Sequence, residues 1–222
     1  VLYDWKPSPF CMKVRAVLAH KGLAYETRPA LRHIKDLYRR GGIGKVPALE
    51  LGDEFLIDST DICHRLEREF PERPVLPSDP RERAQCHVYE ELCDESLYFF
   101  GLYYHWHEPE GRRRAAKYFA RTLLGRLFFR PFLGRVERQL QGHGLGRKTP
   151  AHVRADLERN LEAFDTLLAG RDYLLGHGPH LCDFALASHL AYLILAPAPR
   201  DALASRPNLR RLLERCPSDL KR

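Results

Sequence analysis

Apolar and polar positions alternate in two ways along the first 70 residues. Apolar residues two positions apart are typical of strands, whereas spacings of three and four are typical of helices. The pattern predicts strands at 1–5, 23–28, 46–51 and 55–57, and helices at 8–22, 34–40 and 59–70. The order strand–helix–strand–helix–strand–strand–helix favours a small mixed α/β sheet with helices on its faces.

Capping residues mark where these helices begin and end. Ser8 and Pro9 fit the N-cap and the first helical position, and Gly22 fits the end of the same helix. The helix at 34–40 is predicted to end at Gly41-Gly42, and Ser59 is the predicted cap of the next helix.

A proline-rich stretch at 71–78 separates this region from a different pattern. Asp79-Pro80-Arg81-Glu82 matches a capping box with proline at the first helical position. Helices are predicted at 79–106, 112–141, 150–169, 183–195 and 207–215. The segment 183–195 is apolar on nearly every side, which predicts a buried central helix that Pro197 ends. The sequence therefore predicts an α/β domain at 1–77 and an all-helical domain at 78–222.

Composition excludes several classes of protein. The chain has 222 residues, 44% of them hydrophobic, so it can bury a core without a metal or disulfide staple. No apolar run approaches about 18 residues, so no membrane span is expected. The first six residues lack the pattern of a signal peptide. We interpret Cys86, His87 and Cys93 as two turns of one helix face, and no metal is expected.

Six cysteines are scattered along the chain without the spacing of a disulfide scaffold. They lie at positions 11, 63, 86, 93, 182 and 216. Reduced thiols in a cytoplasmic protein are the simplest interpretation.

The positive charge is concentrated in one stretch. The net charge is +7, yet residues 112–154 hold twelve Lys or Arg and one acid, so the rest of the chain sums to −4. Arg112-Arg113-Arg114 with nearby aromatic residues superficially fits nucleic-acid binding. Those aromatic residues are Tyr118, Phe119, Phe128 and Phe129. Apolar residues at helical spacing favour an amphipathic helix with a solvated cationic face, so a nucleic acid is not the expected partner.

Ser8-Pro9-Phe10-Cys11 stands where a strand turns into a helix. A helix N-terminus stabilises an anion such as a thiolate, and the Ser8 hydroxyl can donate a hydrogen bond to it. Cys11, about one turn into the helix, is itself a candidate acidic thiol. The simpler alternative is that Ser8 only caps the helix and Cys11 only packs.

Two further pairs carry possible chemistry. If the Val46–Pro47 bond is cis, the Val46 backbone is free to pair with an extended ligand; otherwise Pro47 only starts an edge strand. Asp58 and Ser59 begin a helix, where together they can hold the amino and carboxylate groups of an amino acid. Their alternative role is to cap that helix.

In combination these segments resemble the cytosolic glutathione transferases, over residues 1–215. The matching motifs are S-P-F-C-M-K-V-R at 8–15, G-K-V-P-A-L at 44–49, I-D-S-T-D-I at 57–62 and D-F-A-L-A-S-H-L at 183–190. The resemblance implies a thioredoxin-like domain followed by a helical domain. It also implies glutathione as co-substrate, a homodimer and a cytoplasmic enzyme.

The same resemblance implies a role for each matching residue. Ser8 lies beside the glutathione sulfur, and Phe10 is among the residues that bind glutathione. The Val46 main chain, before a cis-Pro47, contacts the cysteinyl part, while Lys45 helps to hold the glycyl carboxylate. Asp58 and Ser59 hold the γ-glutamyl end. The helix ending near residue 106 lines the pocket for a hydrophobic electrophile, with lining residues Tyr98, Tyr103, Tyr104 and Trp106.

The resemblance also shows departures. Many members have Glu or Gln where Asp58 stands, and a Ser or Thr cap where His180 precedes Asp183. The stretch from Gly142 to Lys148 and the helix after it look like the metaxin-like and failed-axon-connection-like members, which are less clearly catalytic.

Three functions follow as hypotheses. The first is conjugation of glutathione to a hydrophobic electrophile through Ser8. The second is a glutathione-dependent thiol reductase that uses Cys11, although Ser8 occupies the position expected for an attacking cysteine. The third is a non-catalytic binding or scaffold module.

Overall fold

The computed structural model describes residues 1–41 and 45–215, without the side chains of residues 118, 124 and 128. Gly42 in the predicted helix stop, Gly44 in the motif at 44–49 and Cys216 lie outside the described residues, as do the side chains of Tyr118 and Phe128.

The N-terminal half contains a four-stranded mixed sheet with the predicted order of elements. These are β1 (Leu2–Asp4), α1 (Pro9–Lys21), β2 (Thr27–Pro29), a 3₁₀ turn (Ala30–Arg32), α2 (Ile34–Arg39), β3 (Ala48–Leu51), β4 (Glu54–Ile57) and α3 (Ser59–Glu69). The strands lie in the order β2-β1-β3-β4. β1 and β2 are parallel, and the other two pairs are antiparallel.

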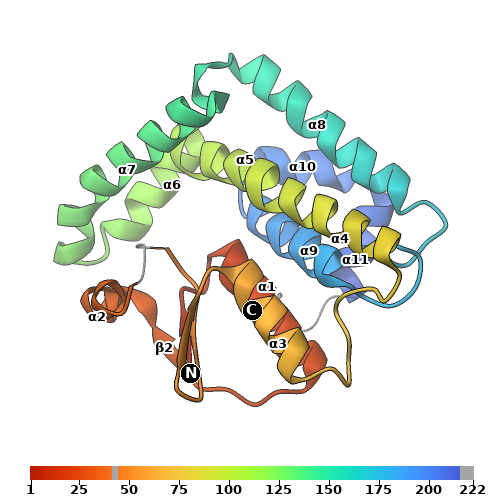
Figure 1. The fold of residues 1–222 in the computed structure, drawn as a ribbon. Coiled ribbons are helices and arrows are strands. Elements are labelled where there is room, and N and C mark those ends of the chain that lie inside the picture. The colour runs from red at the N-terminus through yellow and green to blue at the C-terminus, as the bar shows by residue number, and fades with distance from the viewer. Residues whose placement is uncertain (42–44, 216–222) are drawn as a thin grey trace.

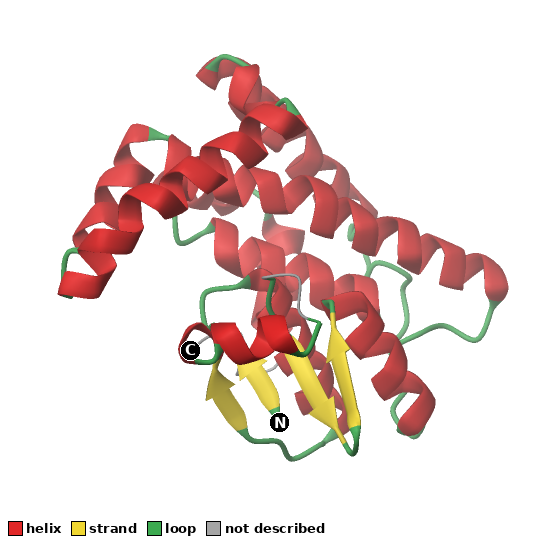
Figure 2. Cartoon of the chain, turned by 60° about the vertical axis from the view of Figure 1, so that its left-hand side comes forward, coloured by secondary structure: helices red, strands yellow, loops and turns green. Residues whose placement is uncertain are grey.

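Alternation of side chains along the strands gives the sheet two buried faces. Leu2 of β1 and Leu49 of β3 are register partners that join the main core with α1 and α3. Tyr3 and Ala48, the next pair, face the opposite way and pack with Leu37 of α2. Figure 2 shows α2 crossing in front of the sheet, so the sheet is covered on both faces.

The described residues after α3 form helices joined by loops and turns. These elements are α4 (Pro80–Leu92), a π-helical turn (Cys93–Leu97), α5 (Tyr98–Leu102), a second π-helical turn (Tyr103–His107), α6 (Pro109–Phe119), α7 (Leu123–His143), a 3₁₀ turn (Leu145–Arg147), α8 (Pro150–Leu167), α9 (Leu181–Leu193), α10 (Pro197–Ala204) and α11 (Pro207–Arg215). As predicted, α9 is buried on nearly every side, and it packs against α1 and α4 (Figure 1). The predicted fold class is confirmed.

Several boundaries were predicted wrongly. The stretch 112–141 is two helices, because the Thr122 hydroxyl caps a new helix by accepting from the Gly125 N–H at 3.0 Å. Pro197 starts α10 as well as following α9. The cap of α3 is Asp58 rather than Ser59, since the Asp58 carboxylate accepts from the Thr60 N–H at 2.9 Å.

The structure also bears on the expectations for the cysteines and for a membrane span. The five described cysteines are buried free thiols. Among the helices of the described residues, none combines the length and apolar character needed to cross a bilayer.

Candidate functional site

Three chain segments meet at one end of the sheet. Tyr3 pairs with Ala48 and Ala48 pairs with Ile57, so the end of β1, the start of β3 and the end of β4 lie at the same edge. Ser8 follows the first strand, Val46-Pro47 precedes the second and Asp58-Ser59 follows the third. The sheet register therefore brings together all three predicted segments, which are far apart in the sequence.

Ser8 caps α1, as predicted. Its N–H donates to the Trp5 carbonyl at 2.8 Å, and its hydroxyl oxygen accepts from the Cys11 N–H at 3.4 Å. The hydroxyl hydrogen is left for a further acceptor. Ser8 is only 4% exposed, and a hydrogen bond is stronger when shielded from water. The position combines a hydroxyl donor with the positive end of a 13-residue helix.

Cys11 lies inside the fold rather than at its surface. Its side chain is 0% exposed, and its sulfur accepts from the Trp5 N–H at 3.4 Å. Burial raises the pKa of Cys11 to about 12. A thiol with that pKa is protonated near neutral pH and a poor nucleophile. The structure therefore favours a packing role for Cys11 over the attacking role in the reductase hypothesis.

Val46–Pro47 is a cis peptide bond, as the family resemblance implies. Pro47 is buried, whereas Val46 is partly exposed and Lys45 is exposed. β3 begins only at Ala48, so the Val46 backbone precedes the strand ladder. The Val46 backbone, which is predicted to pair with an extended ligand, therefore lies beside this edge of the sheet.

Asp58 adopts an unusual backbone conformation. Its φ is 78° and its ψ is 132°, and a positive φ is costly for a residue with a side chain, of the order of 1–3 kcal/mol. Its carboxylate is exposed even as it caps α3, and Ser59, the first residue of α3, is 3% exposed. The strained backbone of Asp58 lies at a helix N-terminus and its carboxylate is exposed. Such strain often occurs at functional sites, so this position is a candidate ligand site.

A buried ionic cluster contacts the first turn of α3. Lys13 of α1 is 0% exposed, and its ammonium lies 2.6 Å from Glu90 and 2.5 Å from Asp94. It also donates to the Thr60 hydroxyl at 3.2 Å, and that hydroxyl donates to Glu90 at 2.6 Å. We name these four residues the Lys13 cluster. It ties α1 and the first turn of α3 to α4 and the π-helical turn after it.

The Lys13 cluster holds two carboxylates against one cation. Burial raises the pKa of Asp94 to about 6, and the neighbouring Glu90 adds to this against the opposing effect of Lys13. The nearby His189 is fully buried, and burial lowers its pKa to about 3, so its ring is neutral. The His189 Nε2 and Asp94 Oδ1 atoms are 3.7 Å apart, and neither has a hydrogen-bond partner among the described residues.

This pKa predicts a pH dependence of stability. A carboxyl group with a higher pKa in the folded chain stabilises the fold at low pH, and that contribution is lost as the pH rises from about 4 to above 6. The rise from 3.8 to about 6 corresponds to about 3 kcal/mol. Asp94→Asn should remove this pH-dependent loss of stability. The free energy of unfolding of the variant, measured in urea and compared with that of wild type, should therefore be more favourable at pH 7.5 than at pH 5.

Asp156 provides a control of opposite sign. A hydrogen bond from Lys148 lowers the pKa of Asp156, so its contribution is present at neutral pH and lost on acidification. Asp156→Asn should therefore lose stability relative to wild type at pH 7.5 rather than gain it. The same trend in both variants would contradict the assignment to Asp94.

The four aromatic residues of the predicted substrate pocket differ in burial. Phe10 and Tyr98 are half-buried, with ring centroids 4.8 Å apart, next to the N-terminus of α1. Tyr103, Tyr104 and Trp106 are only 4, 5 and 9% exposed. The Trp106 indole donates to the Tyr192 hydroxyl at 3.1 Å within the helical core. Tyr98 is thus partly exposed beside Phe10, whereas Tyr103, Tyr104 and Trp106 are buried.

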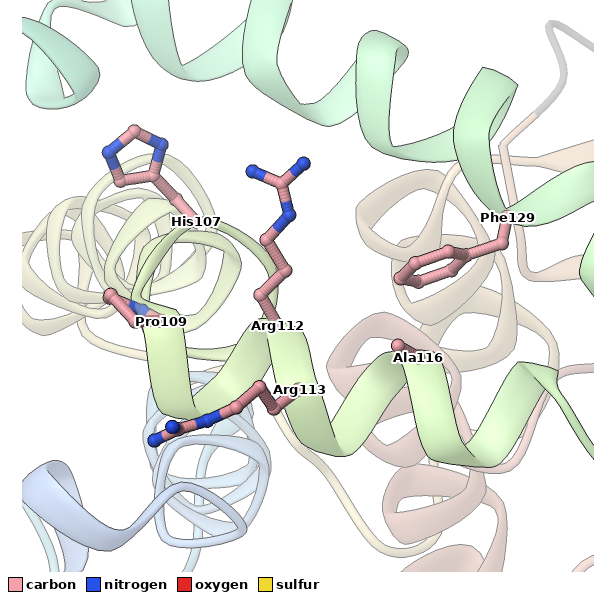
Figure 3. A pocket seen from close by; sticks show the side chains of 6 residues that line it. All are labelled: His107, Pro109, Arg112, Arg113, Ala116 and Phe129. Atoms are coloured by element: carbon pink, nitrogen blue, oxygen red, sulfur yellow. The ribbon is translucent and has the colours of Figure 1, made fainter.

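Two cavities lie away from Ser8. One of about 450 Å³ lies between α6 and α7, where His107 and Arg112 project toward α7 and Phe129 projects back (Figure 3). Glu137 pairs with His107 at 2.8 Å there. The other, of about 190 Å³, is lined by residues that include His20 and Phe184.

Sequence reasoning missed the Lys13 cluster. Lys13 lies within the motif at 8–15, where the sequence pattern assigns it no role. Its signal was available, because it is a cation on a helix whose residues three and four positions away (Phe10, Ala16 and Val17) are apolar. Such a cation predicts a buried partner, but the sequence does not say which acids supply it.

His180 was expected to be a weak cap for α9. The structure leaves this role to Asp183, whose carboxylate accepts from the His180 N–H at 2.9 Å and from the Leu174 N–H at 2.8 Å. Asp183 thus fixes both the start of α9 and the loop before it.

Family models match both halves of the chain. Residues 2–74 match the N-terminal domain of glutathione S-transferase, and residues 129–215 match its C-terminal domain.

Relatives and solved structures agree with these matches. The probable glutathione S-transferase parA of Nicotiana tabacum is 29% identical over 60% of this chain and 64% of its own length, so the match spans less than two thirds of that relative. The isoprene-epoxide glutathione S-transferase of a Rhodococcus species is 25% identical, over 94% of this chain and 90% of its own. A glutathione S-transferase structure from Methylobacterium radiotolerans, in complex with glutathione sulfonate, is 28% identical with a TM-score of 0.64, covering 96% of this chain and 88% of its own.

Proposed function

Since the chain belongs to the glutathione S-transferase family, we propose that it conjugates the glutathione thiolate to a hydrophobic electrophile. Ser8 stabilises the thiolate with its hydroxyl and the α1 N-terminus. The Val46 backbone, before cis-Pro47, pairs with the cysteinyl part, and Lys45 attracts the glycyl carboxylate. Asp58 and Ser59 bind the γ-glutamyl amino and carboxylate groups.

The observation that carries this proposal is the convergence at one sheet edge. A helix-capping serine, a backbone segment that precedes the β3 ladder and a strained acidic helix start lie together there. These three parts match the sulfur, the peptide and the amino-acid end of glutathione in chemistry. The Methylobacterium structure in complex with glutathione sulfonate supports glutathione as the ligand.

The reaction needs little beyond thiolate formation and positioning. The glutathione thiol loses its proton to solvent, and the sulfur electron pair forms a C–S bond with the electrophilic carbon. The leaving group departs with the pair of the bond that breaks. Lowering the pKa of the thiol by one unit is worth about 1.4 kcal/mol, and positioning both reactants supplies more. Phe10 and Tyr98 offer an apolar surface beside the sulfur site.

Two measurements test this proposal directly. Calorimetry should show glutathione binding at millimolar concentration or tighter, and an activated aromatic halide should be consumed at a rate that saturates with glutathione. Absence of binding at millimolar glutathione would instead support the scaffold hypothesis. Binding without turnover of several electrophiles would contradict the catalytic part.

Cys11→Ala separates conjugation from thiol reduction. Because Cys11 is buried and its pKa is raised to about 12, we expect its removal to leave kcat/KM for conjugation within about threefold of wild type. The cost should appear in stability, at about 1 kcal/mol or more for the lost volume. A glutathione-dependent disulfide reductase activity that disappears in this variant would support the reductase hypothesis instead.

The proposal includes an oligomeric state and a cellular compartment. We expect a homodimer, which light scattering in solution tests against a monomer mass. Five described cysteines in the thiol form are compatible with the reducing cytoplasm.

A further inference from the structure

The helical hairpin formed by α6 and α7 concentrates positive charge. Residues 109–143 contain nine Lys or Arg and two acids. One of the acids, Glu137, is engaged with His107 and Arg112. Arg113, Arg114 and Lys117 of α6 are all exposed. The hairpin therefore presents a cationic surface.

One face of α7 combines this charge with exposed leucines. Leu123, Arg126, Leu127 and Arg130 are spaced i, i+3, i+4 and i+7, which places them on one side of the helix. The two leucines are 75% and 66% exposed. Among the described residues, neither arginine has a carboxylate partner, although Arg126 donates to the Ala120 carbonyl at 2.9 Å. We call these four residues the Leu123 face.

The place of this face in the fold leaves it accessible. Figure 1 shows α6 and α7 side by side at one side of the molecule, and the turn that joins them lies far from α8 and α11. The Leu123 face begins directly at this turn, since α7 starts at Leu123.

From the Leu123 face we propose that the hairpin docks the protein peripherally on an anionic lipid bilayer. A helix lies in a membrane interface when it sets apolar side chains beside basic ones, because leucines enter the acyl boundary while the cations meet lipid phosphates. The phosphates of a nucleic acid would pair with the cations but would not bury the exposed leucines. An acidic protein surface would match the charge alone. The combination on one face favours the bilayer.

Vesicle sedimentation tests the docking surface. Wild-type protein should sediment with vesicles of equimolar phosphatidylcholine and phosphatidylglycerol, and not with pure phosphatidylcholine. Raising the salt concentration should release it. Leu123→Gln combined with Leu127→Gln should weaken partitioning about tenfold, and Arg130→Glu should do the same.

Matched controls lie elsewhere on the surface. Leu31→Gln with Leu195→Gln removes two other exposed leucines, and Arg210→Glu reverses an exposed charge on α11. Both should bind vesicles like wild type, and circular dichroism should show all variants folded.

Two outcomes would overturn the proposal. The first is wild-type protein that stays in solution with anionic vesicles. The second is a leucine variant that binds vesicles as wild type does; if its solution mass also changes, the face belongs to contact with a second copy of this chain. None of these readouts depends on glutathione chemistry, so failure here leaves the proposed function intact.

Discussion

Ser8→Ala should lower kcat/KM for glutathione conjugation by about 100-fold. Removing one preorganised donor from developing or bound negative charge typically costs 10²–10³ in rate. The helix N-terminus remains in the variant, so part of the thiolate stabilisation should persist. The absorbance of the bound thiolate, followed against pH, should show a higher midpoint than in wild type.

The fold should survive this substitution. Loss of the Ser8 cap on the Cys11 N–H costs about 1 kcal/mol, so unfolding should shift only modestly. Ser8→Thr keeps both the hydroxyl and the cap and should recover most of the rate and the wild-type midpoint. If Ser8→Ala changes neither the rate nor the midpoint, Ser8 has no part in the chemistry.

Lys13→Met should destabilise the fold by about 3–5 kcal/mol. The substitution keeps the approximate volume but leaves the carboxylates of Glu90 and Asp94 buried without their cation, and breaking a buried pair from one side costs about this much. Urea unfolding measures the loss. Lys35→Met, at an exposed lysine on α2, is the control and should change stability by no more than about 0.5 kcal/mol.

A triple variant separates the effect of unpaired charge on stability from the effect of lost packing. Lys13→Met combined with Glu90→Gln and Asp94→Asn removes the stranded charges, so it should regain much of the lost stability. If this triple variant is no more stable than Lys13→Met, lost packing rather than charge explains the effect. Because Thr60 bonds to Lys13 and follows Ser59, Lys13→Met should also raise KM for glutathione more than it lowers kcat.

Local patterns identified much of the fold. The spacing of apolar residues predicted the seven elements of the sheet half in order, because each strand and helix carries its own period. Capping was predicted correctly at Ser8, Asp79 and Thr149, because each is a small polar residue followed by a proline at the first helical position. It failed at Asp58, whose positive φ is imposed by the path from β4 into α3. The break at Thr122 was missed because apolar spacing continues across it.

The site was predictable in its parts but not in its assembly. The sequence by itself determined which residue types stand at strand ends and helix starts, since these are properties of short segments. Only the tertiary structure decided that Cys11, Tyr104 and Trp106 are buried and that Lys13 meets Glu90 and Asp94. Burial and the pairing of charges depend on contacts across 77 and 81 positions of chain. Such contacts leave no periodic signal in either segment, because each exists only when packing brings the two together.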